Sequence, residues 1–193
     1  MSNSPIEIFK LWYQKEQELT KIRIPSACCL STNGIDGFPN SRFVSLKDIL
    51  DNKFIITGNL TSRKGVEIES SENVALAFWW IETEKQVRIQ GKAAKISEQL
   101  SDKYFFERNR DSQIVSIVSN QGKLIENNQK LFDGYENIEI TFKNKSLKRP
   151  ENWGGFEIEP LRIEFLEFKQ TRFHNRKLFQ LFDGQWEMTQ LQP

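Results

Sequence analysis

The sequence predicts a mainly β protein with helices, an α+β chain in which antiparallel strands close a barrel. Short runs rich in β-forming residues alternate with turn residues in both halves of the chain, and a helical pattern precedes them. A polar, helix-rich stretch over about residues 97–145 interrupts the strands. Because 193 residues suffice to bury a full core, we expect a single domain over residues 1–193 with that stretch as a helical insert.

The first half of the chain should contain a helix followed by strands. Residues 6–19 place apolar side chains at helical spacing, with Ser4 as a candidate N-cap and Pro5 in the first turn. Residues 26–32 and 41–46 read as two strands around a glycine-rich turn. The remaining elements expected in this half are strands over 53–57, 73–80 and 86–96 and a polar helix over 61–69.

The second half should pass from helices back to strands. Residues 97–118 read as two helices, and residues 124–145 form a charged, helix-rich segment. Closing strands are expected over 155–168, 172–181 and 186–191, with Asp183-Gly184 as a hairpin turn between the last two. An antiparallel barrel accounts for this order of strands.

Composition excludes several classes of function. The chain carries 27 Lys and Arg against 26 Asp and Glu, so it has no global field for nucleic acid and any anion site must be local. No run is long enough to span a membrane, and residues 1–5 lack the order of a signal peptide, so we expect a cytoplasmic protein. The adjacent Cys28 and Cys29 and the single histidine, His174, predict neither a disulfide framework nor a metal site.

An aromatic hydroxyl, a guanidinium and a small hydroxyl recur at four-residue intervals as Tyr104, Arg108 and Ser112. On a helix, residues four apart share a face, so these side chains would converge on an anion such as phosphate. Asp111 could cap a new helix whose free amides also attract anions. The alternative interpretation is a solvated helix face with chance spacing.

Basic residues near strand ends suggest a second anion site. Arg42 and Lys47 bracket one expected strand, and Ser62-Arg63-Lys64 opens the helix that follows another. We therefore expect two separable phosphate sites, one around Arg42, Arg63 and Lys64 and the other around Lys47, Tyr104, Arg108 and Ser112. Two such sites suggest a phosphorylated cofactor beside a phosphorylated substrate.

A third basic group lies near the C-terminus. Arg172, His174 and Arg176 would share one face of the expected strand, because side chains alternate with period two. That face has no apolar stripe to bury, so it meets either water or an anionic ligand. The alternative is an edge strand that is charged against aggregation.

Six ordered motifs resemble the pyridoxamine 5′-phosphate oxidase family. They are Arg42 to Lys47, Ser62 to Lys64, Glu84 to Lys92, Tyr104 to Gln113, Trp153 to Phe156 and Arg172 to Arg176, and they cover nearly the whole chain. The resemblance implies an FMN-binding split β-barrel homodimer with FMN in clefts at the subunit interface. It also implies oxidation of pyridoxamine or pyridoxine 5′-phosphate to pyridoxal 5′-phosphate, with oxygen as acceptor and hydrogen peroxide as product.

The resemblance also implies roles for individual residues. Substrate would be bound by Lys47, Tyr104, Arg108, Ser112, Arg172 and His174. Of these, Arg172 would orient the substrate, and His174 would position it or assist proton removal, so both are candidate catalytic residues. The cofactor would be bound by Arg42, Phe43, Val44, Ser45, Lys47, Thr57, Gly58, Ser62, Arg63, Lys64, Gln86, Gln121, Gly122, Leu166 and Arg176.

The chain departs from the family pattern in places that face the cofactor. Leu166 stands where a tryptophan is usual, Gly122 where a serine is common, and Thr57-Gly58 replaces an aromatic-threonine pair. Each lost hydrogen bond costs on the order of 1 kcal/mol, so we expect weakened FMN binding. Two alternatives stay open: an FMN oxidoreductase for another flat anionic substrate, and a non-catalytic flavin or pyridoxal phosphate binding protein.

Overall fold

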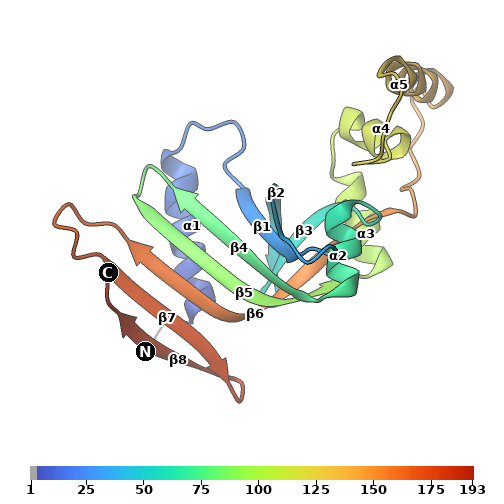
Figure 1. The fold of residues 1–193 in the computed structure, drawn as a ribbon. Coiled ribbons are helices and arrows are strands. Elements are labelled where there is room, and N and C mark those ends of the chain that lie inside the picture. The colour runs from blue at the N-terminus through green and yellow to red at the C-terminus, as the bar shows by residue number, and fades with distance from the viewer. Residues whose placement is uncertain (1–3) are drawn as a thin grey trace.

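A computed structural model describes residues 4–193, so residues 1–3 of the N-terminal stretch considered above lie outside the described residues. The fold is an antiparallel sheet of eight strands in the order β3-β2-β1-β4-β5-β6-β7-β8, and β3 also pairs with β6. The first six strands therefore close into a barrel, and β7 and β8 extend the sheet beyond it (Figure 1). The predicted mainly β, antiparallel barrel is confirmed.

The strands match the predicted pattern with small changes at their ends. Gly184 has φ +77° in the turn between the last two, as the Asp183-Gly184 signal predicts. The bounds are β1 Ala27–Asn33, β2 Pro39–Leu50, β3 Lys53–Asn59, β4 Asn73–Trp80, β5 Lys85–Lys95, β6 Trp153–Glu167, β7 Asn175–Phe182 and β8 Gln185–Leu191.

The interior of the sheet is built by alternation along each strand. One cross-strand row runs through Leu30, Leu76, Ile89, Ile163 and Phe179, all of them buried. The side chains between these positions point to the outer face of the sheet. This alternation gives the molecule one apolar core and one outer, more polar face.

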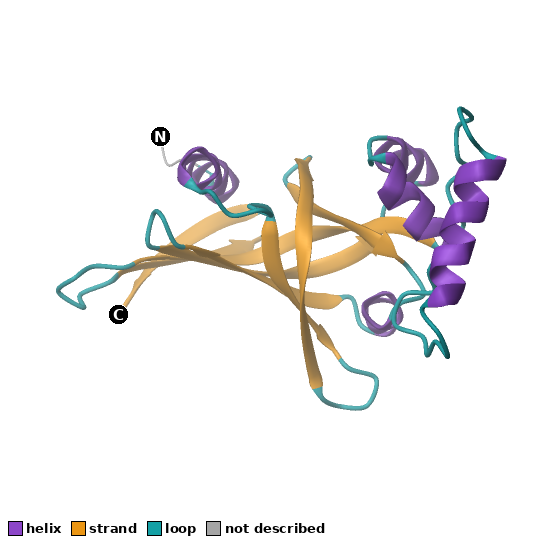
Figure 2. Cartoon of the chain, turned by 90° about the horizontal axis from the view of Figure 1, so that it is seen from above, coloured by secondary structure: helices purple, strands orange, loops and turns teal. Residues whose placement is uncertain are grey.

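Helix α1 (Pro5–Leu19) covers the core at one end of the sheet (Figure 2). The Ser4 side chain caps it by accepting from the Ile6 amide, as predicted. Phe9 is fully buried, and its ring lies 4.9 Å from that of Phe54 and 5.0 Å from that of Phe78. Burial of this ring fixes α1 on the barrel.

The other helices are α2 (Arg63–Ser70), α3 (Glu98–Phe106), α4 (Arg110–Val118) and α5 (Gln129–Thr141). The last three fall within the predicted helical insert and lie at the end of the sheet opposite the turn between β6 and β7 (Figure 1). Phe105 of α3 and Ile114 of α4 join a second apolar cluster with Trp153 of β6. No helix among residues 4–193 is both long enough and apolar enough to cross a membrane.

The prediction of two helices over residues 97–118 is confirmed, but the break between them means that Tyr104, Arg108 and Ser112 do not share one helical face as their spacing suggests. Helix α3 ends at Phe106 and α4 begins at Arg110, so Arg108 lies between them. The N-cap of α4 is Asn109, whose side chain accepts from the Ser112 amide at 2.8 Å, and the predicted cap Asp111 lies inside the helix. An asparagine side chain that accepts from the amide three residues later favours the start of a new helix over a continuous one.

The prediction of a strand from residue 172 is also wrong, because β7 begins at Asn175. Arg172 has φ +67°, and its amide donates to the Lys169 carbonyl at 3.0 Å. The Lys169 amide in turn donates to His174 Nδ1 at 3.1 Å. These local bonds close a tight turn, so only Arg176 of the basic group lies on a strand.

Candidate active site

A cavity of about 520 Å³ lies where β2, β3, α2 and α4 meet. It brings together eight of the predicted cofactor residues with Arg108, one of the predicted substrate residues. The eight are Arg42, Phe43, Val44, Ser45, Thr57, Gly58, Lys64 and Gln121. The predicted cofactor residues thus gather at a cavity that Arg108 also lines, whereas Lys47 lines a separate pocket of about 320 Å³ with Asp48.

Lys64 places a buried positive charge at this cavity. The residue is only 8% exposed, and its Nζ donates to Ser62 Oγ at 3.0 Å and to Gln121 Oε1 at 3.4 Å. Among residues 4–193 no carboxylate lies within ion-pair distance of Nζ, and burial together with the nearby Arg42 charge lowers the pKa of Lys64. A buried ammonium without a counter-ion is stabilised by a bound anion.

Gly58 leaves the space that the Lys64 side chain occupies. A Cβ at this position would lie 3.2 Å from Lys64 Nζ and 3.4 Å from Cε. Ser62, the N-cap of α2, is buried, and its hydroxyl donates to the Asn59 carbonyl at 2.7 Å. The end of β3 and the start of α2 thus hold the ammonium against the cavity.

Glu67 organises the two arginines of the same region, and the sequence interpretation missed it. Its carboxylate is fully buried and accepts from Arg42 at 2.7 Å and from Arg63 Nε at 2.8 Å. Burial raises the pKa of Glu67, but hydrogen bonds led by Thr32, with Arg63, Asn40 and Arg42, outweigh it and lower the pKa to about 2. The spacing from Arg63 to Glu67 on α2 is the one signal that could have found it.

Arg63 itself is turned away from the cavity. Its guanidinium binds Asp36 at 2.7 Å as well as Glu67, and it is not among the cavity residues. The predicted cofactor residue Gly122 follows Gln121 with φ +81° and is exposed. The structure therefore places Lys64 and Arg42, and not Arg63, at the cavity wall.

Four of the predicted substrate residues lie on β2, on α3, in the loop after α3 and on α4, and they are Lys47, Tyr104, Arg108 and Ser112. A β-bulge between Leu46 and Asp48 interrupts the pairing of β2, and it lies beside this region. Lys47 Nζ lies 2.7 Å from Glu107 Oε2 and 5.2 Å from the centre of the Tyr104 ring. The buried Tyr104 hydroxyl donates to Asp48 Oδ2 at 2.9 Å, and burial followed by this bond raises the pKa of Tyr104.

Arg108 makes no ion pair with a carboxylate among the described residues, unlike Lys47. Its guanidinium lies over the Trp153 ring at 5.1 Å and donates to the Ser112 carbonyl at 3.2 Å. Its buried Nε has no hydrogen-bond partner among residues 4–193, and burial lowers the pKa of the side chain. Buried donors without partners are uncommon in folded proteins. The Arg108 residue also lines the cavity, so its guanidinium lies where a ligand would bind.

A third group of predicted residues lies apart from the cavity. Gln86, Leu166 and Arg176 are direct neighbours in one row across β5, β6 and β7 on the outer face of the sheet. Arg176 Nε donates to Glu164 Oε1 at 2.7 Å, and Glu164 also binds Arg88. A single chain therefore does not bring this row to Lys64.

Arg172 and His174 also lie away from the cavity, in the turn between β6 and β7. Figure 1 shows this turn at the opposite end of the sheet from α4. The exposed Arg172 makes no side-chain ion pair among the described residues, and the His174 ring packs 4.9 Å from that of Phe168. The predicted catalytic residues are thus separate, within one chain, from the predicted substrate-phosphate residues Lys47, Tyr104, Arg108 and Ser112.

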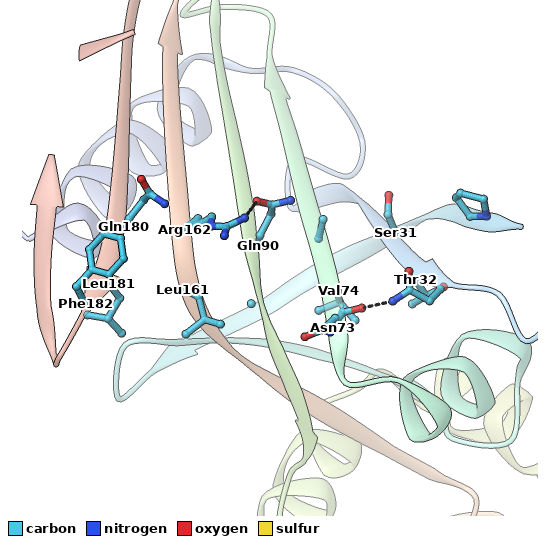
Figure 3. A pocket seen from close by; sticks show the side chains of 14 residues that line it. Ser31, Thr32, Asn73, Val74, Gln90, Leu161, Arg162, Gln180, Leu181 and Phe182 are labelled. Carbon is cyan, nitrogen blue, oxygen red and sulfur yellow. Dashed lines mark hydrogen bonds between the residues drawn. The ribbon is translucent and has the colours of Figure 1, made fainter. Parts of the chain in front are cut away.

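A second cavity of about 570 Å³ follows the outer face of the sheet (Figure 3). It contains none of the predicted site residues, and Arg162 is the one charged residue that lines it. The Arg162 side chain donates to Gln90 Oε1 at 3.5 Å. Without a cluster of titratable groups this groove lacks catalytic chemistry, although it is larger than the cavity at Lys64.

Comparison with known families agrees with the motifs. Residues 15–143 match the family model described as pyridoxamine 5′-phosphate oxidase, and residues 153–193 match the pyridoxine 5′-phosphate oxidase C-terminal dimerisation region. The chain belongs to the pyridoxamine 5′-phosphate oxidase family. Its last three strands correspond to the dimerisation region of that family.

Curated relatives match over nearly their full length. A pyridoxine/pyridoxamine 5′-phosphate oxidase from Trichormus variabilis is 37% identical over 100% of this chain and 90% of the relative. One from Flavobacterium johnsoniae is 40% identical over 89% of this chain and 80% of the relative. These relatives carry oxidase names, which supports an oxidoreductase activity for this chain.

Solved structures share the fold. PhzG from Burkholderia lata, solved with tetrahydrophenazine-1-carboxylic acid, has a TM-score of 0.92 and 29% identity, covering 98% of this chain and 93% of that protein. A pyridoxamine 5′-phosphate oxidase-related, FMN binding protein from Nostoc punctiforme has a TM-score of 0.80 at 16% identity, with full coverage of both chains.

Proposed function

We propose that this protein oxidises pyridoxamine 5′-phosphate and pyridoxine 5′-phosphate to pyridoxal 5′-phosphate, with FMN as cofactor and oxygen as electron acceptor. The observation that carries the proposal is the buried Lys64 ammonium, which has no carboxylate counter-ion among residues 4–193 and stands beside Arg42 in a cavity of about 520 Å³. A phosphate at this point would supply the missing negative charge. Membership of the pyridoxamine 5′-phosphate oxidase family supports the proposed oxidation at this cavity.

The residues at the cavity fit FMN. Lys64 and Arg42 would bind its phosphate with Ser62 alongside, Gln121 would contact the polar edge of the flavin, and the backbone of Phe43 to Ser45 with Thr57 and Gly58 would line its path. Arg63 would contribute indirectly, by binding the Glu67 carboxylate that also binds Arg42. Bound FMN would supply the two-electron redox chemistry that links oxidation of the substrate to reduction of oxygen.

We propose that a second copy of the chain completes each site. Gln86, Leu166 and Arg176 form a row on the outer face of the sheet, and Arg172 and His174 lie at its end, away from the cavity of their own chain. The groove in Figure 3 runs along the same face and is lined in part by residues of the dimerisation region. Packing of two such faces would bring one chain's row to the other chain's cavity.

Lys47, Tyr104, Arg108 and Ser112 would bind the phosphate of the substrate. Arg108 has the clearest capacity, because it lines the cavity and makes no ion pair in the described part of the chain. Arg172 would orient the pyridine ring and its substituents from the second subunit. The amine substrate consumes one oxygen and one water and yields ammonia and hydrogen peroxide, whereas the alcohol substrate needs oxygen alone.

His174 is placed to donate a hydrogen bond. Its Nδ1 accepts from the Lys169 amide, so the neutral ring carries its proton on Nε2. In this tautomer Nε2 donates to the amine or hydroxyl of the substrate and does not take a proton from it. We therefore assign His174 to positioning the substrate, and a decrease of tenfold or less in the reductive rate of His174→Ala is the expected result.

The decisive experiment is anaerobic mixing of the FMN-loaded protein with pyridoxine 5′-phosphate. We expect the flavin absorbance near 450 nm to bleach, and admission of oxygen to restore it with one hydrogen peroxide per turnover. Persistent yellow colour would contradict oxidation and leave a non-catalytic flavin binding protein. Failure of FMN to bind at micromolar concentration would contradict the cofactor assignment.

A second candidate function is oxidation of a flat, carboxylated ring compound. The observation that favours it is the likeness to PhzG, which was solved with tetrahydrophenazine-1-carboxylic acid. A carboxylate would meet the same cations as a phosphate ester. Anaerobic titration with this compound separates the two functions, because only the true substrate should bleach the flavin at micromolar concentration.

A further inference from the structure

Two of the predicted substrate-phosphate residues, Lys47 and Tyr104, already bind carboxylates of the protein itself. Lys47 Nζ is 2.7 Å from Glu107, and the Tyr104 hydroxyl is 2.9 Å from Asp48. Lys47 is the predicted cation that a carboxylate neutralises here, whereas Arg108 lines the cavity at Lys64. An anionic substrate group must therefore displace a carboxylate or share its cation.

Glu107 is the carboxylate that a ligand can displace. It follows the last turn of α3, its side chain is 41% exposed, and its second oxygen lies 4.0 Å from Lys103. Asp48 differs, because its other oxygen accepts from the Ile49 amide at 2.7 Å and it is bonded to a buried hydroxyl. The Glu107 side chain can thus swing into solvent at little cost, whereas Asp48 is held on both sides.

We propose that Glu107 is a specificity-determining residue of the substrate site, an internal carboxylate that competes with the anionic group of the substrate for Lys47. This inference rests on the proposed function of Lys47 as a substrate contact. Glu107 weakens the attraction of the site for a phosphate dianion and leaves the affinity for an uncharged vitamer unchanged. It thereby reduces the preference for phosphorylated over unphosphorylated ligands.

The size of the effect follows from the exposure of the pair. Lys47 and Glu107 are both partly exposed, so solvent screens their attraction. Repulsion between Glu107 and a phosphate dianion is screened in the same way. We expect removal of the Glu107 charge to tighten phosphate binding about three- to fivefold at low salt, with the gain shrinking as salt is added.

The test uses Glu107→Gln in the full-length, FMN-loaded protein, with inorganic phosphate, pyridoxine 5′-phosphate and pyridoxine as probes. Dissociation constants for inorganic phosphate and pyridoxine are measured by calorimetry in 20 mM and 300 mM salt, and the constant for pyridoxine 5′-phosphate, which turns over under the proposed function, is measured as KM under the same conditions. We expect the constants for both phosphate probes to fall about three- to fivefold at low salt and the constant for pyridoxine to stay the same. In a Lys47→Gln background, Glu107→Gln should give less than half of this gain.

The matched control is Glu72→Gln, which removes another partly exposed carboxylate that lies 2.6 Å from a lysine, Lys92. It should leave all three constants unchanged. Equal phosphate binding by the wild type and Glu107→Gln would overturn the inference, and so would failure of both to bind phosphate. Tighter inorganic phosphate binding by Glu107→Gln, in a protein that does not oxidise pyridoxine 5′-phosphate, would support the inference and contradict the proposed function.

Discussion

The two anion sites of this molecule use acidic residues in opposite ways. At the cofactor site, Glu67 is fully buried and binds Arg42 and Arg63, and Lys64 has no carboxylate partner in the part of the chain that the structure describes. At the substrate site, Glu107 is partly exposed and lies directly on Lys47. Glu67 therefore holds the arginines of the cofactor site in place, whereas Glu107 neutralises a cation of the substrate site.

This difference fits the two ligands that we propose. A cofactor that stays bound requires a preorganised site, and a buried network that is fully satisfied is rigid. A substrate that must leave requires contacts that exchange readily, and a partly exposed ion pair is weak. The predictions below test this contrast, in order of decreasing expected effect.

The largest effect is expected in the acid stability of the Glu67 network. Because the pKa of folded Glu67 is about 2 and its ordinary value is 4.5, its contribution to the unfolding free energy is complete above about pH 4.5. That contribution is lost as the pH falls towards 2, by up to about 3 kcal/mol. Urea unfolding between pH 2.5 and 6 should show a shallower pH dependence in Glu67→Gln than in the wild type. Parallel curves would mean that Glu67 is not the fixed element of the cofactor site.

The next effect is loss of FMN affinity in Lys64→Met. A hydrogen bond to a charged group contributes about 2 kcal/mol, so the FMN dissociation constant should rise roughly 30-fold. Quenching of flavin fluorescence measures it. The control Lys95→Met removes a surface lysine that binds Glu69 at 2.8 Å and should bind FMN like the wild type. An unchanged constant in Lys64→Met would remove the central support for the cofactor site.

A smaller effect is expected in Tyr104→Phe, which deletes the hydroxyl bonded to Asp48. We expect a loss of about 1 kcal/mol in unfolding free energy and a several-fold rise in KM for pyridoxine 5′-phosphate. Tyr135→Phe is the matched control, because it deletes a hydroxyl that donates to Asp111 at 2.7 Å. If both variants had the same KM, Tyr104 would have only a structural role.

The smallest effect is expected in Leu166→Trp. Leu166 lies between Gln86 and Arg176 on the outer face, and a larger aromatic surface there should tighten FMN binding about threefold. Leu11→Trp, at an exposed position on α1, is the control for an added indole. A gain in affinity that disappears on dilution of the dimer would show that the row acts on the partner's cofactor.

The fold was predictable because each strand carries its own local sequence signal. Alternating apolar residues and turn signals placed the strands to within a few residues, and Ser4 and Pro5 placed the start of α1. Two expectations fail for local reasons. Asn109 caps the second of the two predicted helices at the Ser112 amide, so Tyr104, Arg108 and Ser112 do not share one face, and Arg172 adopts a left-handed conformation that strand periodicity does not anticipate.

The site was predictable only as a set of residue types. Arg42, Lys64 and Arg108 stood out because cations in ordered motifs resemble a known family, and the structure gathers them around one cavity. Glu67 and Glu107 did not stand out, since an acid on a charged helix resembles surface until its partners are known. Their contacts join β2 to α2 and β2 to the end of α3, and such pairings over long sequence distances are invisible in the sequence.

The sequence by itself determined the barrel, the helical insert and the family, because strand periodicity, turn chemistry and ordered motifs are written along the chain. Only the tertiary structure decided which cation is left free and which is neutralised by an acid. The reason is electrostatic: whether a charge attracts a ligand depends on its burial and on the nearest opposite charge, and both are set by residues distant in the chain.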